Sequence, residues 1–243
     1  MKIKDWNELP PEMQTDEVRT YYNYLQTKKV SLFFKRMFDI VVSSLMLIVL
    51  FPIFIAISVA IKLDSKGPVF FRQERVTQYN RVFKIFKFRS MVQNSESGSG
   101  ITISNDTRIT RIGKFIRKYR LDELSQLIDV FRGTMTFVGT RPESVKYVKQ
   151  YTPEMMATLL LPAGVTSLAS IYFKDEAELL ESTNDVDKKY VEDILPIKMH
   201  YNLKGIQEFS FWGDIKIMFM TVFAVLGKNY KDGYIEEKKM LWK

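Results

Sequence analysis

The chain contains no cysteine, and His200 is its single histidine. Without cysteine it can form no disulfide, no thiolate zinc site and no cysteine nucleophile. A Ser-His-Asp triad would have to use His200, and no serine-containing turn of the kind that carries such a nucleophile stands near it. We therefore interpret His200 as structural, and any chemistry must use carboxylates, lysine, arginine and a hard metal ion.

Acidic residues are in the minority, since 28 Asp and Glu face 36 Lys and Arg for a net charge of +8. Such a balance indicates an anionic partner, which can be nucleic acid, an acidic lipid surface or a phosphorylated small molecule. With 243 residues and 46% hydrophobic content the chain is not disordered, and it can form one sizeable domain or two small ones.

Long uncharged runs are also rare, and the exception is residues 40–61, which include Pro52 just past their middle. A straight helix of that length rises about 30 Å and could cross a bilayer, but Pro52 should kink or break it. Lys and Arg flank the run equally on both sides, whereas a crossing segment usually shows an imbalance. We predict a re-entrant hairpin that enters one leaflet and turns near Phe51 and Pro52. A kinked transmembrane helix and a buried core helix are the alternatives.

Charged residues stand directly before this run. We expect Lys35 and Arg36 to face anionic head groups. Asp39 is too costly to place in hydrocarbon without a partner, so we expect it at the interface, against Arg36. The run begins far from the N-terminus, and we expect no cleaved secretory signal.

Short strands are predicted at residues 69–71 and 82–88, which are rich in Val, Ile and Phe. A period of two would put Lys87 and Arg89 on one face, with Phe86 and Phe88 on the other. Such a cationic face suits phosphate. Aromatic residues between cations also suit single-stranded nucleic acid, which stays an alternative.

An acidic pair stands at the predicted start of a helix. Apolar residues recur at 124, 127, 128 and 131 and predict a helix that ends near Gly133. Asp122 and Glu123 would fall at its start, where free N–H groups stabilise negative charge. Arg117 stands just upstream and could help to hold a phosphate beside them. Simple helix capping by Asp122 is the alternative.

A second helix start is predicted after a strand at residues 135–138. Thr140 and Glu143 have capping-box spacing, with Pro142 in the first turn, so Arg141 would grip a phosphate at this helix start. Residues 162–166 are predicted to form a turn. Asp214, before an apolar stretch at residues 215–226, is a second candidate acidic ligand or a helix cap.

Six segments of the sequence resemble one known family, the bacterial sugar transferases or monotopic phosphoglycosyl transferases. The resemblance runs from about residue 34 to residue 226. In chain order the segments are KRMFDIVVSS, GPVFFRQERV, FKIFKFRSM, DTRITRIGKFIRKYRLDELSQL, RGTMTFVGTRPE and LPAGVTSLAS. The string around LDEL, together with VG-x-RPE, is the most specific part.

The resemblance implies an enzyme that transfers a sugar 1-phosphate from a UDP-sugar to polyprenyl phosphate and releases UMP, as the first membrane step in making a glycan. It implies Mg²⁺ as cofactor and attachment to the cytoplasmic face of a bacterial inner membrane through the re-entrant hairpin. Asp122 would be the nucleophile and Glu123 would assist metal binding or proton removal. Lys87, Arg117 and Arg141 would bind phosphate, and Asp214 matches a further acidic position.

The sequence departs from the family pattern at a few places. Ser125 and Thr140 stand where proline is usual, and Ser167 and Leu168 replace a more usual Gly-Trp or Gly-Leu pair. The first two changes affect helix caps rather than chemistry. The last pair bears on the choice of sugar.

We predict a mainly helical α+β fold with a few short strands and membrane-surface helices. Its parts would be an N-terminal helical extension (1–34), the re-entrant hairpin (35–66), a catalytic domain (67–227) and a charged tail (228–243). Partners would be the UDP-sugar, polyprenyl phosphate and the bilayer, without nucleic acid, and a homo-oligomer stays open. The alternative is a membrane-tethered scaffold of the same fold without catalysis.

Overall fold

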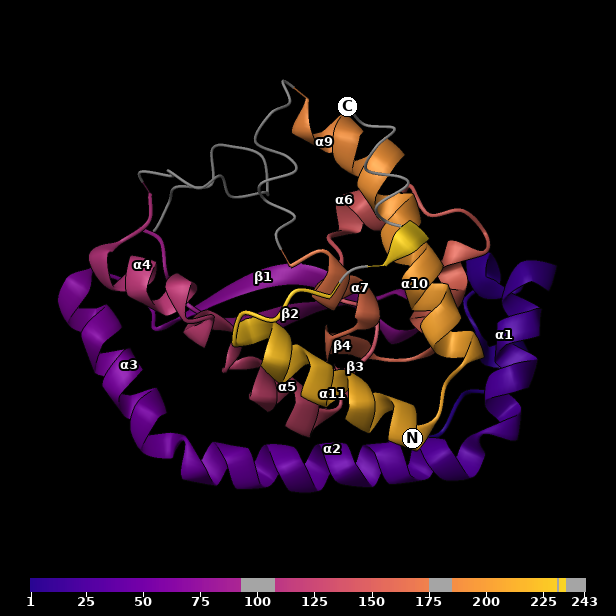
Figure 1. The fold of residues 1–243 in the computed structure, drawn as a ribbon, viewed down its shortest axis with the longest axis horizontal. Coiled ribbons are helices and arrows are strands. Elements are labelled where there is room, and N and C mark those ends of the chain that lie inside the picture. The colour runs from indigo at the N-terminus through magenta and orange to yellow at the C-terminus, as the bar shows by residue number, and fades with distance from the viewer. Residues whose placement is uncertain (93–107, 175–184, 231, 235–243) are drawn as a thin grey trace.

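The structure is a computed structural model of residues 1–243, and it describes residues 1–92, 108–174, 185–230 and 232–234. The described part is mainly helical and carries two small sheets of two strands each, which confirms the predicted α+β class (Figure 1). The predicted loop at residues 93–106 lies outside the described residues. Most of the charged tail and most of the acidic region before Lys189 lie outside them too.

The N-terminal segment packs against the domain rather than standing apart. Two 3-10 turns, η1 (Trp6–Glu8) and η2 (Pro11–Met13), lead into α1 (Asp16–Thr27), which Thr15 caps through its side chain. The apolar face of α1 holds Val18, Tyr21, Tyr22 and Leu25, all buried in the largest hydrophobic cluster of the described residues.

A long helix, α2 (Lys29–Val49), runs along one edge of the molecule and continues after Leu50 as α3 (Phe51–Asp64) (Figure 1). The two helices meet at a bend of 61°, and Pro52 lies in the first turn of α3. The break predicted near Phe51 and Pro52 is therefore confirmed. Within the described residues no helix alone has the length and apolarity to cross a bilayer, whereas the bent pair meets that requirement by length and composition.

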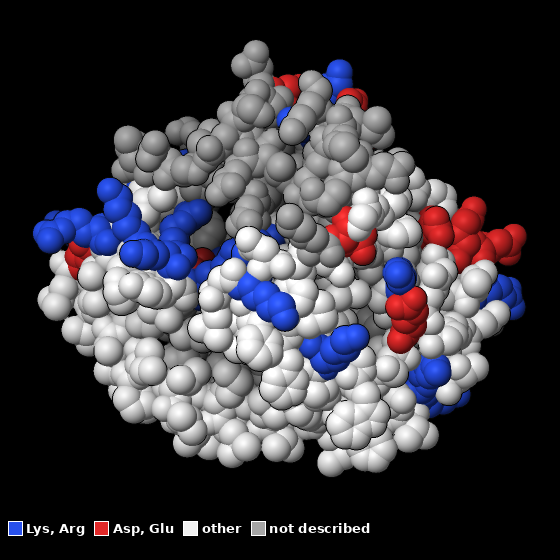
Figure 2. Space-filling model, in the orientation of Figure 1, with Lys and Arg blue, Asp and Glu red and all other residues white. Residues whose placement is uncertain are grey.

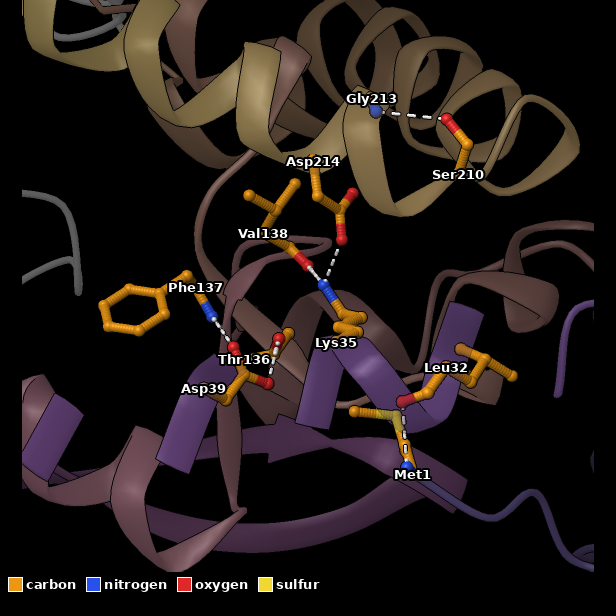
Figure 3. A network of polar contacts seen from close by, with 10 residues as sticks. All are labelled: Met1, Leu32, Lys35, Asp39, Thr136, Phe137, Val138, Ser210, Gly213 and Asp214. Atoms are coloured by element: carbon orange, nitrogen blue, oxygen red, sulfur yellow. Dashed lines mark hydrogen bonds and ion pairs between the residues drawn. The ribbon is translucent and has the colours of Figure 1, made fainter. Parts of the chain in front are cut away.

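Three charged side chains of α2 face the domain, which corrects two expectations from the sequence. Lys35 donates to Val138 O and to Asp214 (Figure 3), and Arg36 donates to Val130 O and Phe131 O, so neither cation is directed at head groups. Asp39 is buried and does not pair with Arg36. It accepts hydrogen bonds from Thr136 Oγ1 (2.7 Å) and Phe137 N (3.2 Å), because a strand edge supplies donors there.

The first sheet is an antiparallel hairpin of β1 (Phe70–Thr77) and β2 (Arg81–Phe88), longer in its first strand than predicted. Tyr79 and Asn80 take positive φ values of 59° and 55° in the tight connection. Arg89 does not share a face with Lys87, contrary to the prediction. It follows the strand, is buried, and donates to Ser65 O (2.7 Å) at the end of α3.

The acidic pair does not begin a helix, contrary to the prediction. After α4 (Arg111–Lys118) the chain turns at Arg120, whose φ of 52° is left-handed, into the 3-10 turn η4 (Leu121–Glu123). Helix α5 (Gln126–Arg132) starts three residues after Glu123 and has Gly133 as its C-cap, so it ends near Gly133, as predicted. The left-handed residue and the short turn fix where the two carboxylates lie.

Strand β3 (Met135–Val138) has the predicted bounds, but no helix starts at Arg141. Residues 163–166 form β4 (Ala163–Thr166) instead of the predicted turn and pair with β3 in parallel. Thr140 continues this pairing, since its carbonyl accepts from Gly164 N (2.8 Å). The capping box therefore does not form, and helix α6 (Val145–Val148) begins only after Ser144.

The segments that carry Gly139 and Gly164 approach closely just after β3. A Cβ placed on Gly164 would lie 2.2 Å from the backbone nitrogen of Gly139. Only glycine fits at this position. This contact holds the segment that carries Arg141 against β4.

The remaining elements close the domain. They are η5 (Met155–Leu160), α7 (Leu168–Tyr172), α9 (Val186–Lys189), the π-helical turn η6 (Tyr190–Ile194), α10 (Leu195–Gln207) and α11 (Phe211–Val225). Helix α10 supplies buried residues to two hydrophobic clusters, and α11 contacts α2 along the edge of the molecule.

Candidate active site

A cleft of about 200 Å³ opens on one face of the β1–β2 hairpin. Strand β2 contributes Ile85 and Lys87, and the chain after β3 contributes Arg141 and Glu143. The rest of its lining is Gln73, Arg75, Gln126, Pro142, Ser144, Lys146, Tyr147, Asp187, Tyr190 and Lys198. Most of these side chains are polar, which suits a charged, water-soluble ligand.

An ion pair links the acidic pair to a cationic side chain of the cleft. Glu123 forms an ion pair with Arg141, one of the lining residues. Burial alone would raise the pKa of Glu123, but Arg141 and Lys87 hold it at about 2. Glu123 is therefore ionised throughout the neutral range and is a poor proton acceptor there.

Asp122 has the opposite tendency. Burial raises the pKa of this carboxyl above its ordinary value of 3.8, Glu123 raises it further, and Lys87 and Arg117 oppose the rise. A more basic carboxylate is a better nucleophile once it is ionised. The two neighbouring acids thus differ in proton affinity, as is common at catalytic sites.

Lys87 interacts electrostatically with both carboxylates. Burial lowers its pKa, Glu123 and Asp122 counter this, and Arg141 adds to it. The structure therefore brings Lys87, Arg141, Asp122 and Glu123 into one electrostatic unit, and Arg117 on α4 contributes its charge to Asp122. The five candidate residues come from four different segments, and each of them affects the pKa of an acid of the pair or belongs to that pair.

The other end of the cleft was not predicted from the sequence. Glu143 is buried and accepts hydrogen bonds from Tyr190 Oη (2.5 Å) and Lys198 Nζ (3.2 Å), and Lys198 also reaches Tyr190 Oη (2.8 Å). Burial would raise the pKa of Glu143, but Lys198, Tyr190 and Arg75 hold it below its usual range. These partners are far apart in the chain, so no local pattern could have indicated them.

Asp214 lies elsewhere. It stands in the first turn of α11, lines a separate and smaller cavity, and pairs with Lys35 at 2.6 Å (Figure 3). The helix is capped by Ser210, whose Oγ accepts from Gly213 N (Figure 3). The structure gives Asp214 a role in joining α2 to α11 and no contact with the acidic pair.

Within the described ranges no group of three or more His, Cys, Asp or Glu side chains could hold a metal ion. Asp122 and Glu123 are adjacent carboxylates, which is the oxygen donor type that Mg²⁺ prefers. Because Mg²⁺ usually takes one or two protein carboxylates and completes its shell with water and substrate phosphate, the pair fits a metal that arrives with a nucleotide diphosphate.

Comparison with known proteins decides the family. The family model described as "Bacterial sugar transferase" matches residues 30–228, which is most of the chain. The chain belongs to the bacterial sugar transferase family. The resemblance seen in the sequence motifs is confirmed.

Similar proteins within this sugar transferase family are named for related activities. A UDP-glucose:undecaprenyl-phosphate glucose-1-phosphate transferase of Klebsiella pneumoniae is 38% identical over 80% of this chain and 40% of its own length. A UDP-N-acetylgalactosamine-undecaprenyl-phosphate N-acetylgalactosaminephosphotransferase of Aeromonas hydrophila is 37% identical over 80% of this chain and 44% of its own length. An undecaprenyl-phosphate galactose phosphotransferase of Salmonella typhimurium is 31% identical over 83% and 42%. The chain thus spans about two fifths of the length of these relatives.

Proposed function

We propose that this sugar transferase moves a sugar 1-phosphate from a UDP-sugar to polyprenyl phosphate and releases UMP. The observation that carries the proposal is the electrostatic unit of Asp122 and Glu123 with Lys87, Arg117 and Arg141 beside a polar cleft. The relatives are named for this type of transfer to undecaprenyl phosphate.

In the first step a carboxylate oxygen of Asp122 attacks the β-phosphorus of the UDP-sugar. A bond forms between this oxygen and phosphorus, and the bond from phosphorus to the bridging oxygen breaks. UMP leaves with that oxygen, and an aspartyl phosphosugar remains. Lys87 and Arg141 balance the negative charge of the phosphate oxygens, which would otherwise repel the carboxylate.

In the second step a phosphate oxygen of the polyprenyl phosphate attacks the same phosphorus. The bond to Asp122 breaks, the carboxylate is restored, and the product is a polyprenyl diphosphate sugar. Two successive displacements allow a soluble donor and a lipid acceptor to use one site in turn.

Glu123 acts best as an ionised partner of Arg141. With a pKa of about 2 it holds no proton to give and accepts one poorly at neutral pH. Its ion pair with Arg141 orients the guanidinium beside the cleft. We therefore favour positioning and metal binding for Glu123 over removal of a proton from the acceptor.

Magnesium is part of the proposal, with Asp122 and Glu123 as its protein ligands. When bound, the ion would neutralise charge on the diphosphate. Lys87 and Arg141 would share this task.

We propose attachment to the cytoplasmic face of a bacterial membrane, and the orientation of α2 supports contact with a membrane. Three of its charged residues, Lys35, Arg36 and Asp39, face the protein, while apolar side chains face outward, the reverse of a helix on a water-soluble domain. The exposed apolar residues on α2, α3 and α11 include Phe33, Phe34, Met37, Val41, Leu45, Ile48, Phe51, Val59, Trp212, Phe219, Phe223 and Val225.

The charged side chains keep to other parts of the surface. Figure 2 shows Lys and Arg gathered over α4 at the upper left, and an uncharged lower edge where α2 lies in Figure 1. Large exposed apolar surfaces mark contact with a membrane or partner. We propose that this edge lies in the bilayer, with the bent pair α2 and α3 as a re-entrant segment.

The test is release of UMP. Purified protein with Mg²⁺, polyprenyl phosphate and a panel of UDP-sugars should release UMP with at least one of them, and Asp122→Asn should abolish release. Asp16→Asn, on the exposed side of α1, is the matched control and should keep full activity. Full activity in Asp122→Asn would refute the nucleophile. No release with any UDP-sugar would favour the scaffold without catalysis.

A further inference from the structure

One polar side chain in the cleft is buried without a partner. Gln126, the first residue of α5, is 1% exposed, and neither its Nε2 nor its Oε1 has a hydrogen-bond partner among the described residues. Buried amides are almost always hydrogen-bonded, because leaving both atoms unpaired costs free energy. An unpaired amide at this position requires an explanation.

The position of Gln126 supplies one. It lines the cleft together with Lys87 and Arg141, one helical turn after Asp122. Its neighbour Ser125 is satisfied internally, since its hydroxyl donates to Phe86 O. The unpaired amide therefore stands at the wall of the cavity, next to the cations that would hold the diphosphate.

The chemistry of the amide restricts its ligand. A carboxamide offers N–H donors and a carbonyl acceptor, and both lie unpaired here. A phosphate oxygen only accepts, so it could satisfy Nε2 and would leave Oε1 without a donor. The polyprenyl phosphate offers no other polar group. Neighbouring sugar hydroxyls, or the N3–H and carbonyl of uracil, offer a donor and an acceptor together.

We propose that Gln126 binds a neutral donor and acceptor pair on the UDP-sugar and so positions this substrate, rather than the lipid acceptor, beside Asp122. The pair belongs either to the sugar or to the uracil, which present the same chemistry to an amide. This inference rests on the proposed function. It gives a role to a residue that the quoted motif contains but to which the sequence analysis assigned none.

The test uses Gln126→Met, which keeps the size and removes both polar atoms. The catalytic efficiency kcat/KM for the UDP-sugar should fall about tenfold, as expected for loss of hydrogen bonds to a neutral group. The kcat/KM for polyprenyl phosphate should change less, because it reports the second displacement. Gln150→Met, at an exposed glutamine, is the matched control and should change neither.

Inhibition by UMP separates the two sources, because UMP carries uracil and no sugar. Weaker inhibition of Gln126→Met by UMP, by the same factor, would assign the amide to uracil, and unchanged inhibition would assign it to the sugar. An unchanged kcat/KM for the UDP-sugar would overturn the proposal, as would a larger loss for polyprenyl phosphate.

Thermal unfolding shows whether the Gln126 side chain has a purely structural role. Since the amide has no internal partner, Gln126→Met should keep the wild-type Tm or raise it. A Tm below that of Gln150→Met would show that the amide supports the fold and would overturn the proposal. If the wild-type protein releases no UMP from any UDP-sugar, the proposed function fails, and this outcome is distinct from a Gln126 variant that behaves as wild type.

Discussion

Removing the charge of Lys35 should destabilise the protein strongly. Its ammonium lies 2.6 Å from Asp214, and the two side chains are 4% and 14% exposed. Lys35→Met leaves the carboxylate of Asp214 buried without a cation. Removal of one partner from a buried ion pair costs about 3–5 kcal/mol of unfolding free energy.

Removing both charges should cost less than the two single changes suggest. Burial raises the pKa of Asp214 even though Lys35 opposes it, so desolvation outweighs the attraction within the pair. The double variant Lys35→Met with Asp214→Asn has no unpaired charge. Its loss should therefore fall short of the sum of the single losses by about 2 kcal/mol, within the range for residues in direct contact.

The assay is urea unfolding followed by tryptophan fluorescence, with all variants in the same detergent. The loss of unfolding free energy in Lys35→Met should be largest at neutral pH and should shrink as the pH falls toward 3.8, the ordinary pKa of Asp214. The loss shrinks in this direction because a carboxyl group whose pKa is higher in the folded than in the unfolded protein destabilises the fold when it is ionised, and protonation removes this destabilisation. Additive losses below about 1 kcal/mol each, typical of a surface pair, would refute the reasoning.

Three further predictions concern the cleft and its support. Arg141→Lys keeps the charge but loses the planar donor set, so kcat/KM for the UDP-sugar should fall by about 10²–10³, and near wild-type values would contradict its role on phosphate. Glu143→Gln should lower the unfolding free energy at neutral pH. The difference in unfolding free energy between the variant and the wild type should narrow as the pH falls below 4.5 and through the lowered pKa of Glu143 in the folded protein, because protonated Glu143 no longer attracts Lys198. A difference that does not depend on pH would argue against the ion pair of Glu143 with Lys198. Gly164→Ala should destabilise by about 1–3 kcal/mol or more in thermal unfolding, because its Cβ would strike Gly139, and a wild-type Tm would contradict this contact.

Motifs in the sequence indicated Asp122, Glu123, Lys87 and Arg141 as candidate site residues. In the structure Glu123 pairs with Arg141, and the charges of Lys87 and Asp122 act on this pair. The backbone around them was predicted only in part. The expected helix start at the acidic pair was wrong, because the left-handed turn at Arg120 and a 3-10 turn replace it. The spacing of apolar residues indicates which face of a helix is buried, but it does not indicate that one residue, Arg120, has a positive φ.

Long-range pairs explain the remaining errors. Thr140 does not cap a helix, because its carbonyl accepts a hydrogen bond from the backbone nitrogen of Gly164. Gly164 belongs to a strand that the sequence predicted as a turn. Lys35 was expected at the membrane surface, but its partner Asp214 is 179 residues away in the chain. Such partners become visible only when the fold brings them together.

The proposed reaction requires that Asp122 carry the phosphosugar covalently. Intact-protein mass spectrometry detects such an adduct after incubation with Mg²⁺ and a UDP-sugar that the protein turns over, without polyprenyl phosphate. We expect a mass increase equal to one sugar phosphate, located on Asp122 by peptide mapping and lost when the lipid acceptor is added. Steady UMP release with no such adduct, or an equal adduct in Asp122→Asn, would contradict it.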